Sequence, residues 1–156
     1  MFGNEDTKLY RVLMFDELEE YESVIERLTS AAERGDGIAL SNRGLARAEI
    51  GEADEALVDF TAAIAAIPRA SVPRMNRGNL LEKLDRSDEA LIDYGAAVEL
   101  EPQDPYYRRT RAHLLHHLGR FAEAIADYDV AIEIEPDLRR TRDDRDRARD
   151  KLPVTS

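Results

Sequence analysis

The stretch NRGNLLEKLDRSDEALIDYGAAVELEP, residues 76–102, decides the fold because related versions of it occur three times in the chain. The version before it is NRGLARAEIGEADEALVDFTAAIAAIP at 42–68, and the version after it is TRAHLLHHLGRFAEAIADYDVAIEIEP at 110–136. Each copy therefore begins 34 residues after the previous one. This period is typical of stacked two-helix units, each too thin to bury its own apolar face. We predict an all-α repeat protein that works by binding.

Five positions recur in phase across the three copies. Small residues at fixed places let two helices approach closely, and an aromatic side chain fills the wedge between them. A proline closes each copy because it lacks an N–H and clashes with a preceding helical turn. The five series are Gly44, Gly78 and Ala112; Ala56, Ala90 and Ala124; Phe60, Tyr94 and Tyr128; Ala63, Ala97 and Ala131; and Pro68, Pro102 and Pro136.

Residues that form turns or end helices recur in each copy, and their positions predict six helices. Gly51, Asp85 and Gly119 mark the turn inside each copy, and the prolines mark the connection to the next. We expect helices near 38–50, 53–67, 72–84, 88–101, 106–118 and 122–135.

These runs resemble tetratricopeptide repeats, in which a small residue, an alanine, an aromatic and a proline follow at these offsets. The resemblance extends from Gly37 to Leu138 without an insertion. It implies an all-α fold, a short right-handed α-solenoid of three helical hairpins with capping helices at both ends. The expected domains are an N-terminal segment and capping helix at 1–36, repeats at 37–70, 71–104 and 105–138, and a C-terminal solvating helix and tail at 139–156.

Both ends of the chain carry cap-like patterns. In 16–34 an apolar stripe recurs at spacings of three and four residues, which predicts a helix that covers the first repeat. Residues 7–15, TKLYRVLMF, are too apolar for a disordered tail. They form either the first helix of a degenerate hairpin with 16–34 or a surface buried against another copy of the chain. At the other end, Thr141, Ala148 and Leu152 can face inward from a charged helix.

Composition excludes several classes of protein. No apolar run is long enough to span a membrane and no secretory segment is visible, so we expect a cytoplasmic protein without a membrane partner. The absence of cysteine excludes disulfides, thiolate metal sites and cysteine nucleophiles. A net charge of −11 repels phosphate backbones and argues against nucleic acid as a partner.

A basic and an acidic residue recur together in the repeats. An arginine precedes the small residue of each first helix, and an aspartate sixteen residues later precedes the aromatic of each second helix. A repeating opposite-charge pair indicates a bidentate tie between the two helices of a unit, and binding of a ligand anion is the alternative. The pairs are Arg43 with Asp59, Arg77 with Asp93, and Arg111 with Asp127.

The resemblance implies that the first helices line a concave groove that receives an extended peptide or a partner helix. Projection at 100° per residue selects the groove side of each first helix. In the first repeat this is the side opposite Leu40, Arg43, Gly44 and Arg47. Asn42 and Asn76 are in register there, and their amides can donate to and accept from a peptide backbone. The predicted groove residues are Ile38, Ser41, Asn42, Leu45, Met75, Asn76, Asn79, Tyr106, Arg109, Thr110, His113 and His116.

The chemistry of this predicted groove changes along its length. Some members of the family grip a C-terminal carboxylate with Lys and Arg, but the matching positions here are the uncharged Ser41, Val72, Tyr106 and Thr110. We therefore do not expect binding of chaperone tails through that arrangement. The groove runs from apolar and acidic in the first repeat to basic and aromatic in the third. We expect an acidic or C-terminal carboxylate group of the partner near Arg109 and His113.

The sequence gives little support for catalysis. It contains no G-x-S-x-G, phosphate-loop or H-E-x-x-H motif, and a shallow groove is a poor place to desolvate paired carboxylates. His113, His116 and His117 share one helix, but no carboxylate or thiol nearby in sequence completes a metal site, so we expect ordinary surface histidines. We predict no enzyme, no cofactor and no metal.

Two functions of different classes follow from these patterns. The first is an adaptor whose groove binds a peptide or helix of another protein. The second is a self-assembling structural unit, a homodimer or stacked oligomer joined through residues 7–15 or through the ends of the repeats.

Overall fold

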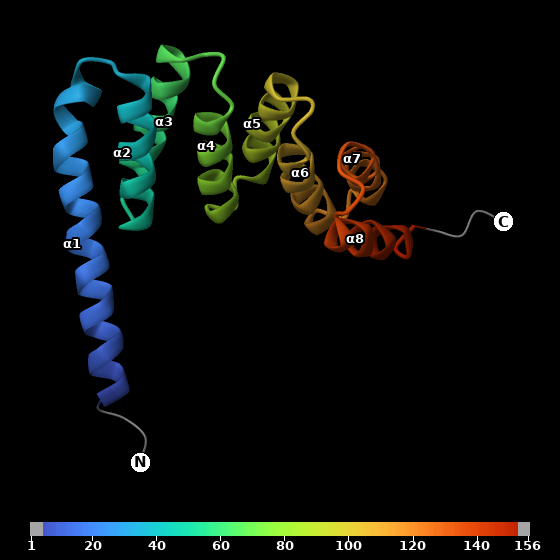
Figure 1. Cartoon of the computed structure of the whole chain (residues 1–156), viewed down its shortest axis with the longest axis horizontal. Coiled ribbons are helices and arrows are strands. Elements are labelled where there is room, and N and C mark those ends of the chain that lie inside the picture. Colours follow the sequence, from blue (N-terminus) through green and yellow to red (C-terminus); the bar gives the residue numbers. More distant parts are fainter. Residues whose placement is uncertain (1–4, 153–156) are drawn as a thin grey trace. The chain divides into compact units, whose positions relative to one another are not determined.

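The computed structural model describes the backbone of residues 5–152 and the side chains of residues 18–152. Every regular element in this part of the chain is an α-helix, as the repeat pattern predicts, and Figure 1 shows their order. The chain divides into two compact units, Met1–Pro68 and Arg69–Ser156. The helices are α1 (Glu5–Glu33), α2 (Gly37–Glu49), α3 (Ala53–Ala66), α4 (Val72–Lys83), α5 (Ser87–Leu100), α6 (Pro105–His117), α7 (Phe121–Ile134) and α8 (Arg139–Arg149).

The six repeat helices α2 to α7 agree with the sequence prediction to within one residue at each end. The chain reverses inside each hairpin at a residue of positive φ, which is Gly51 at 88°, Asp85 at 58° and Gly119 at 74°. Glycine adopts this left-handed conformation without strain, and aspartate tolerates it better than most side chains. The predicted turn residues are therefore confirmed.

The N-terminal helix α1 contradicts the hairpin expected over 7–34. It is one continuous helix of 29 residues and passes without a break through the place where the hairpin would turn. The reason is local, because Glu5–Glu33 contains neither glycine nor proline to interrupt its backbone hydrogen bonds. The degenerate hairpin is thus wrong, and the side-chain packing of 7–15 lies outside the residues that the structure describes.

The second half of α1 covers the first repeat as the stripe in 16–34 predicts. Ala32 is buried in a cluster with Ala39, Leu40 and Ala63, and Leu28 packs against this cluster. The stripe is only partly used, since Tyr21 and Ile25 are half-buried and Leu18 is exposed.

Close approach of the paired helices explains the small-residue series. A Cβ atom added to Gly44 would lie 2.9 Å from the Phe60 ring, and one added to Gly78 would lie 2.6 Å from the Tyr94 ring. Carbon atoms do not pack stably at such distances, so glycine is what admits the aromatic. In the third repeat the ring is fully buried Tyr128 beside buried Ala112.

The C-terminal helix α8 packs on α7. Thr141 and Ala148 are buried, as predicted, and Arg145 and Arg149 bond the carboxylate of Asp129 on α7 at 3.1 to 3.2 Å. The predicted inward position of Leu152 is wrong, because it follows the end of α8 and is 39% exposed. None of the helices described in the structure has the length and apolar character needed to span a membrane.

Candidate functional site

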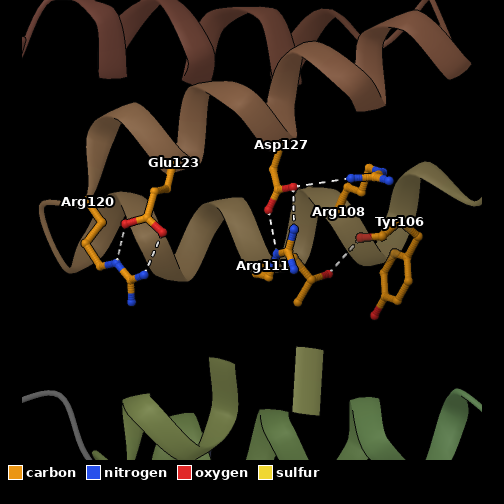
Figure 2. A network of polar contacts seen from close by, with 7 residues as sticks. Tyr106, Arg108, Arg111, Arg120, Glu123 and Asp127 are labelled. Atoms are coloured by element: carbon orange, nitrogen blue, oxygen red, sulfur yellow. Dashed lines mark hydrogen bonds and ion pairs between the residues drawn. The ribbon is translucent and has the colours of Figure 1, made fainter. Parts of the chain in front are cut away.

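The recurring arginine and aspartate form an ion pair inside every hairpin. Arg111 donates from Nε to Asp127 Oδ2 at 2.6 Å and from Nη2 to Asp127 Oδ1 at 2.7 Å, so that the pair is bidentate (Figure 2). Arg43 with Asp59 and Arg77 with Asp93 repeat this geometry at 2.6 to 2.8 Å. The predicted tie between helices is confirmed in all three repeats.

The aspartates of these ties are buried, and additional cations approach two of them. Arg47 Nη1 lies 2.9 Å from Asp59 Oδ2, and Arg108 Nη1 lies 3.5 Å from Asp127 Oδ1. The hydrogen bonds that Arg111 donates to Asp127 raise the pKa of Arg111, so this guanidinium stays charged at any accessible pH. The paired arginines stabilise the fold, and ligand contacts must come from other residues.

In the first unit, the predicted groove residues separate into exposed and buried positions. Ile38, Asn42 and Leu45 are exposed on α2. Asn42 and Leu45 also line a cavity of about 430 Å³ between α1 and α2, together with Tyr21, Val24, Arg27, Leu28 and Ala46. Ser41 is 4% exposed because it faces the core. Its predicted position in the groove is therefore wrong.

In the second unit, the α4 part of the predicted groove is less accessible than expected. Met75 is 3% exposed and belongs to the core, which contradicts its predicted contact with a partner. Asn76 is half-buried. Asn79 is half-buried as well, and its Oδ1 lies 2.8 Å from the hydroxyl of Tyr94. The contact of Asn76 with a ligand amide stays a prediction.

The basic and aromatic residues predicted on α6 follow one another at spacings of three and four residues, which places them on one side of a helix. Tyr106 is exposed, and Thr110 is half-buried and donates to the carbonyl oxygen of Tyr106 at 3.0 Å. Arg109 is half-buried, and its Nε is buried without a hydrogen-bond partner among the described residues. This arginine is therefore unlike the paired arginines of the repeats.

A small cavity lies next to this face, between α6, α7 and α8. Its volume is about 240 Å³, and its lining residues are His113, His116, His117, Tyr128, Asp144 and Arg147. His113 Nε2 lies 3.6 Å from Asp144 Oδ2, and Arg147 Nη1 lies 3.0 Å from Asp144 Oδ1. The cavity thus combines one carboxylate, already paired with an arginine, and several hydrogen-bond donors.

The electrostatics of this cavity favour neutral histidine and neutral tyrosine. Burial lowers the pKa of His113 below its ordinary value, and nearby Arg109 lowers it further, while Asp144 acts in the opposite direction. Burial also raises the pKa of Tyr128, and Asp144 adds to the shift. The Tyr128 hydroxyl therefore keeps its proton and is available as a donor.

The Tyr128 hydroxyl is a feature that the sequence analysis missed. It is buried and has no hydrogen-bond partner among the residues that the structure describes. In the sequence, the aromatic series changes from Phe60 to Tyr94 and Tyr128, so two of its three members carry a hydroxyl. The residues 12 and 15 positions before each tyrosine are the signal that points to this feature, because Tyr94 bonds both of them.

Among the residues that the structure describes, no three His, Cys, Asp or Glu side chains are placed to hold an ion together, and the three histidines are no exception. His116 packs edge-on against Phe121, with ring centroids 5.4 Å apart, and His113 packs edge-on against Tyr128 at 5.6 Å. Both rings thus have an aromatic neighbour.

Comparison with sequences identifies one family. A family model described as tetratricopeptide repeat matches residues 75–139, which include the second and third copies of the motif. Among curated proteins, none matches the sequence.

Comparison with solved structures finds the same architecture in several proteins. The first repeat domain of Spaghetti (RPAP3), bound to the HSP90 peptide SRMEEVD, has a TM-score of 0.67 and 24% identity over 73% of this chain and 90% of that one. The OM64 repeat domain of Arabidopsis has a TM-score of 0.66 and 21% identity over 74% and 96% of the two chains. The MamA protein has a TM-score of 0.71 and 16% identity over 94% and 77%. At these identities the similarity establishes the fold alone.

Proposed function

Because this chain belongs to the tetratricopeptide repeat family, we propose that it is a non-catalytic interaction module that binds a peptide or helix of another protein. The family supplies a scaffold for protein–protein interaction, and one similar structure holds a short peptide. In the first unit, the ligand lies against the exposed face of α2, where Asn42 bonds its backbone and Ile38 and Leu45 receive apolar side chains. In the second unit, Asn76 is the corresponding position for a bond to the ligand backbone.

One observation carries this proposal. The repeat arginines Arg43, Arg77 and Arg111 are each held by a buried aspartate. In the predicted groove, by contrast, Asn42 is exposed and the buried Nε of Arg109 has no hydrogen-bond partner among the described residues. Among the predicted groove residues, the apolar side chains of Ile38 and Leu45 are exposed in the first unit, and that of Tyr106 is exposed in the second. The test is an affinity pull-down from the native organism with the intact chain, compared with a variant in which Asn42 and Leu45 are replaced by Glu. Partners lost from the variant bind the groove, whereas partners retained by it bind elsewhere.

The partner presents an acidic or C-terminal carboxylate group to Arg109. We expect Arg109→Glu to weaken binding by tenfold or more, because a charge-assisted hydrogen bond worth about 1.5–3 kcal/mol is replaced by repulsion. The loss should shrink as salt rises. Isothermal titration calorimetry at two ionic strengths measures both effects, and circular dichroism checks that the variant is folded.

Arg142→Glu is the matched control for this charge reversal, since Arg142 is exposed on α8 and occupies the register position of Arg108 rather than of Arg109. It should bind the partner normally. Unchanged binding by Arg109→Glu together with loss on substituting Asp54 or Glu55, which are exposed on α3, would place the binding surface on the second helices instead.

Self-assembly is a second candidate function, and the length of α1 favours it. A helix of 29 residues rises about 44 Å, whereas α2 with 13 residues rises about 20 Å. Figure 1 shows α1 extending well beyond the end of α2 within the first unit. A stable dimer in light scattering that is lost on deleting residues 1–15 would support assembly, and a monomer at all concentrations would support the adaptor.

A further inference from the structure

The three repeats differ at the para carbon of their buried aromatic residue, which carries a hydroxyl in the second and third repeats but not in the first. In the second repeat, the Tyr94 hydroxyl lies 2.8 Å from Asn79 Oδ1 and 2.8 Å from Glu82 Oε2, so it can donate to either. In the first repeat, Phe60 has no hydroxyl, and the two corresponding positions are the apolar Leu45 and Ala48. The polarity of the surrounding residues thus follows the presence of the hydroxyl in these two repeats.

The third repeat breaks this rule. Tyr128 has the hydroxyl, but the positions that hold Asn79 and Glu82 in the second repeat are occupied by His113 and His116. The hydroxyl is buried with no partner among the described residues, although a buried polar group without a partner costs about 1–3 kcal/mol. Where the carboxylate of Glu82 would be expected by register, the structure has instead the cavity of about 240 Å³ between α6, α7 and α8.

We propose that this cavity is a binding site for a carboxylate group, which bonds Tyr128 from outside the chain as Glu82 bonds Tyr94 from within it. The inference rests on the proposed function in that the carboxylate belongs to the bound partner. The hydroxyl is covered in this structure, and entry of the ligand is accompanied by rotation of His113, whose side chain is 46% exposed.

The charges around the cavity suit one negative group. Asp144 is the carboxylate of the lining, and it is held by Arg147 at 3.0 Å, so that this pair is close to neutral. Arg109 is a further cation one helical turn before His113, and its buried Nε has no hydrogen-bond partner among the described residues. A carboxylate in the cavity accepts from the Tyr128 hydroxyl and from a histidine N–H, and Arg109 supplies the opposite charge.

Stability measurements on two tyrosine variants test the state of the hydroxyl in the free protein. Tyr94→Phe removes a satisfied hydrogen bond and leaves Glu82 and Asn79 without their donor, so its melting temperature should fall. Tyr128→Phe removes an unsatisfied hydroxyl and should leave the melting temperature unchanged or raise it. Phe60 shows that phenylalanine fits this position of a repeat. An equal fall for both variants would mean that Tyr128 is satisfied within the chain, and the proposal would be wrong.

Binding of small carboxylates tests the site itself. The probes are the isosteric pair N-acetyl-glutamate amide, with only a side-chain carboxylate, and N-acetyl-glutamine, with only a terminal one. N-acetyl-glutamine amide, which has neither, is the control. We expect saturable shifts of the His113 and Tyr128 ring signals in NMR spectra, with dissociation constants on the order of 1–10 mM for ligands that make so few contacts. The tighter probe of the pair identifies the source of the carboxylate.

One variant should weaken this binding and another should exclude the probe, while the fold persists in both. Tyr128→Phe loses the neutral donor and should weaken the probe about tenfold. His116→Glu places a carboxylate at the register position of Glu82, so it should occupy the cavity, raise the melting temperature and exclude the probe. Absence of a saturable shift in the unaltered protein, or equal binding by Tyr128→Phe, would overturn the proposal.

Failure of this site and failure of the proposed function give different results. If a protein partner binds and is insensitive to both Tyr128→Phe and His116→Glu, the carboxylate site is wrong and the interaction module stands. If the carboxylate probes bind as expected but a pull-down retains no protein through the groove, the site stands and the proposed function is wrong.

Discussion

Replacing Arg111 by Met should lower the free energy of unfolding by about 3 kcal/mol, because it leaves the carboxylate of Asp127 buried without its main partner. Asp127 is 7% exposed on its side chain and loses both hydrogen bonds from Arg111. Within the described part of the chain, Arg108 is the cation that remains near Asp127, at 3.5 Å. This loss in the free energy of unfolding lies at the lower end of the range for a broken buried ion pair, since Arg111 is itself partly exposed. Urea denaturation followed by circular dichroism measures the loss.

Two comparisons make this prediction specific. Arg43→Met should cost about 1 kcal/mol less, because Arg47 continues to bond Asp59 at 2.9 Å. The double variant Arg111→Met with Asp127→Leu should recover much of the loss, as the buried charge is then gone. If Arg111→Met is as stable as the unaltered protein, the pair is only a surface contact and the arginine is free to serve a ligand.

Replacing Ala90 by Leu should be the second most damaging change, with a loss of about 1–3 kcal/mol from overpacking. Ala90 is fully buried on α5, in the series of small residues that lets the two helices of a hairpin meet. A leucine there forces the backbones apart or the side chain out of its preferred rotamer.

Glu89→Leu is the matched control, since Glu89 is the adjacent residue and is exposed. It loses only an exposed ion pair with Arg86 and should change the stability by less than about 0.5 kcal/mol. Thermal melts of the two variants decide the matter, and similar melting temperatures would contradict close packing at Ala90.

The helices and ion pairs were predictable because each depends on residues that repeat in register. A shared offset of 16 residues between arginine and aspartate indicates the same geometry three times, and helix ends are marked locally by Gly51, Gly119 and the prolines. Repetition therefore turned weak local signals into reliable ones.

The errors arise where the repeat pattern gives no guidance. Ser41 and Met75 lie near the border between the buried and exposed sides of their helices, and a projection at 100° per residue cannot decide such positions. The N-terminal helix has no second copy for comparison, so its apolar start suggested a hairpin. Whether the buried hydroxyl of Tyr128 finds a hydrogen-bond partner depends on three-dimensional contacts that spacing alone does not report.

The ion pair that closes each hairpin also has a consequence for how the chain finds its fold. Each pair joins residues only sixteen apart, so the loop that must close is short, and it is equally short in every repeat. Native contacts of this kind keep the contact order low, which favours rapid folding. Adding or deleting a repeat would change the length of the chain without lengthening any of these loops. The number of repeats can therefore vary without slowing the formation of a single hairpin.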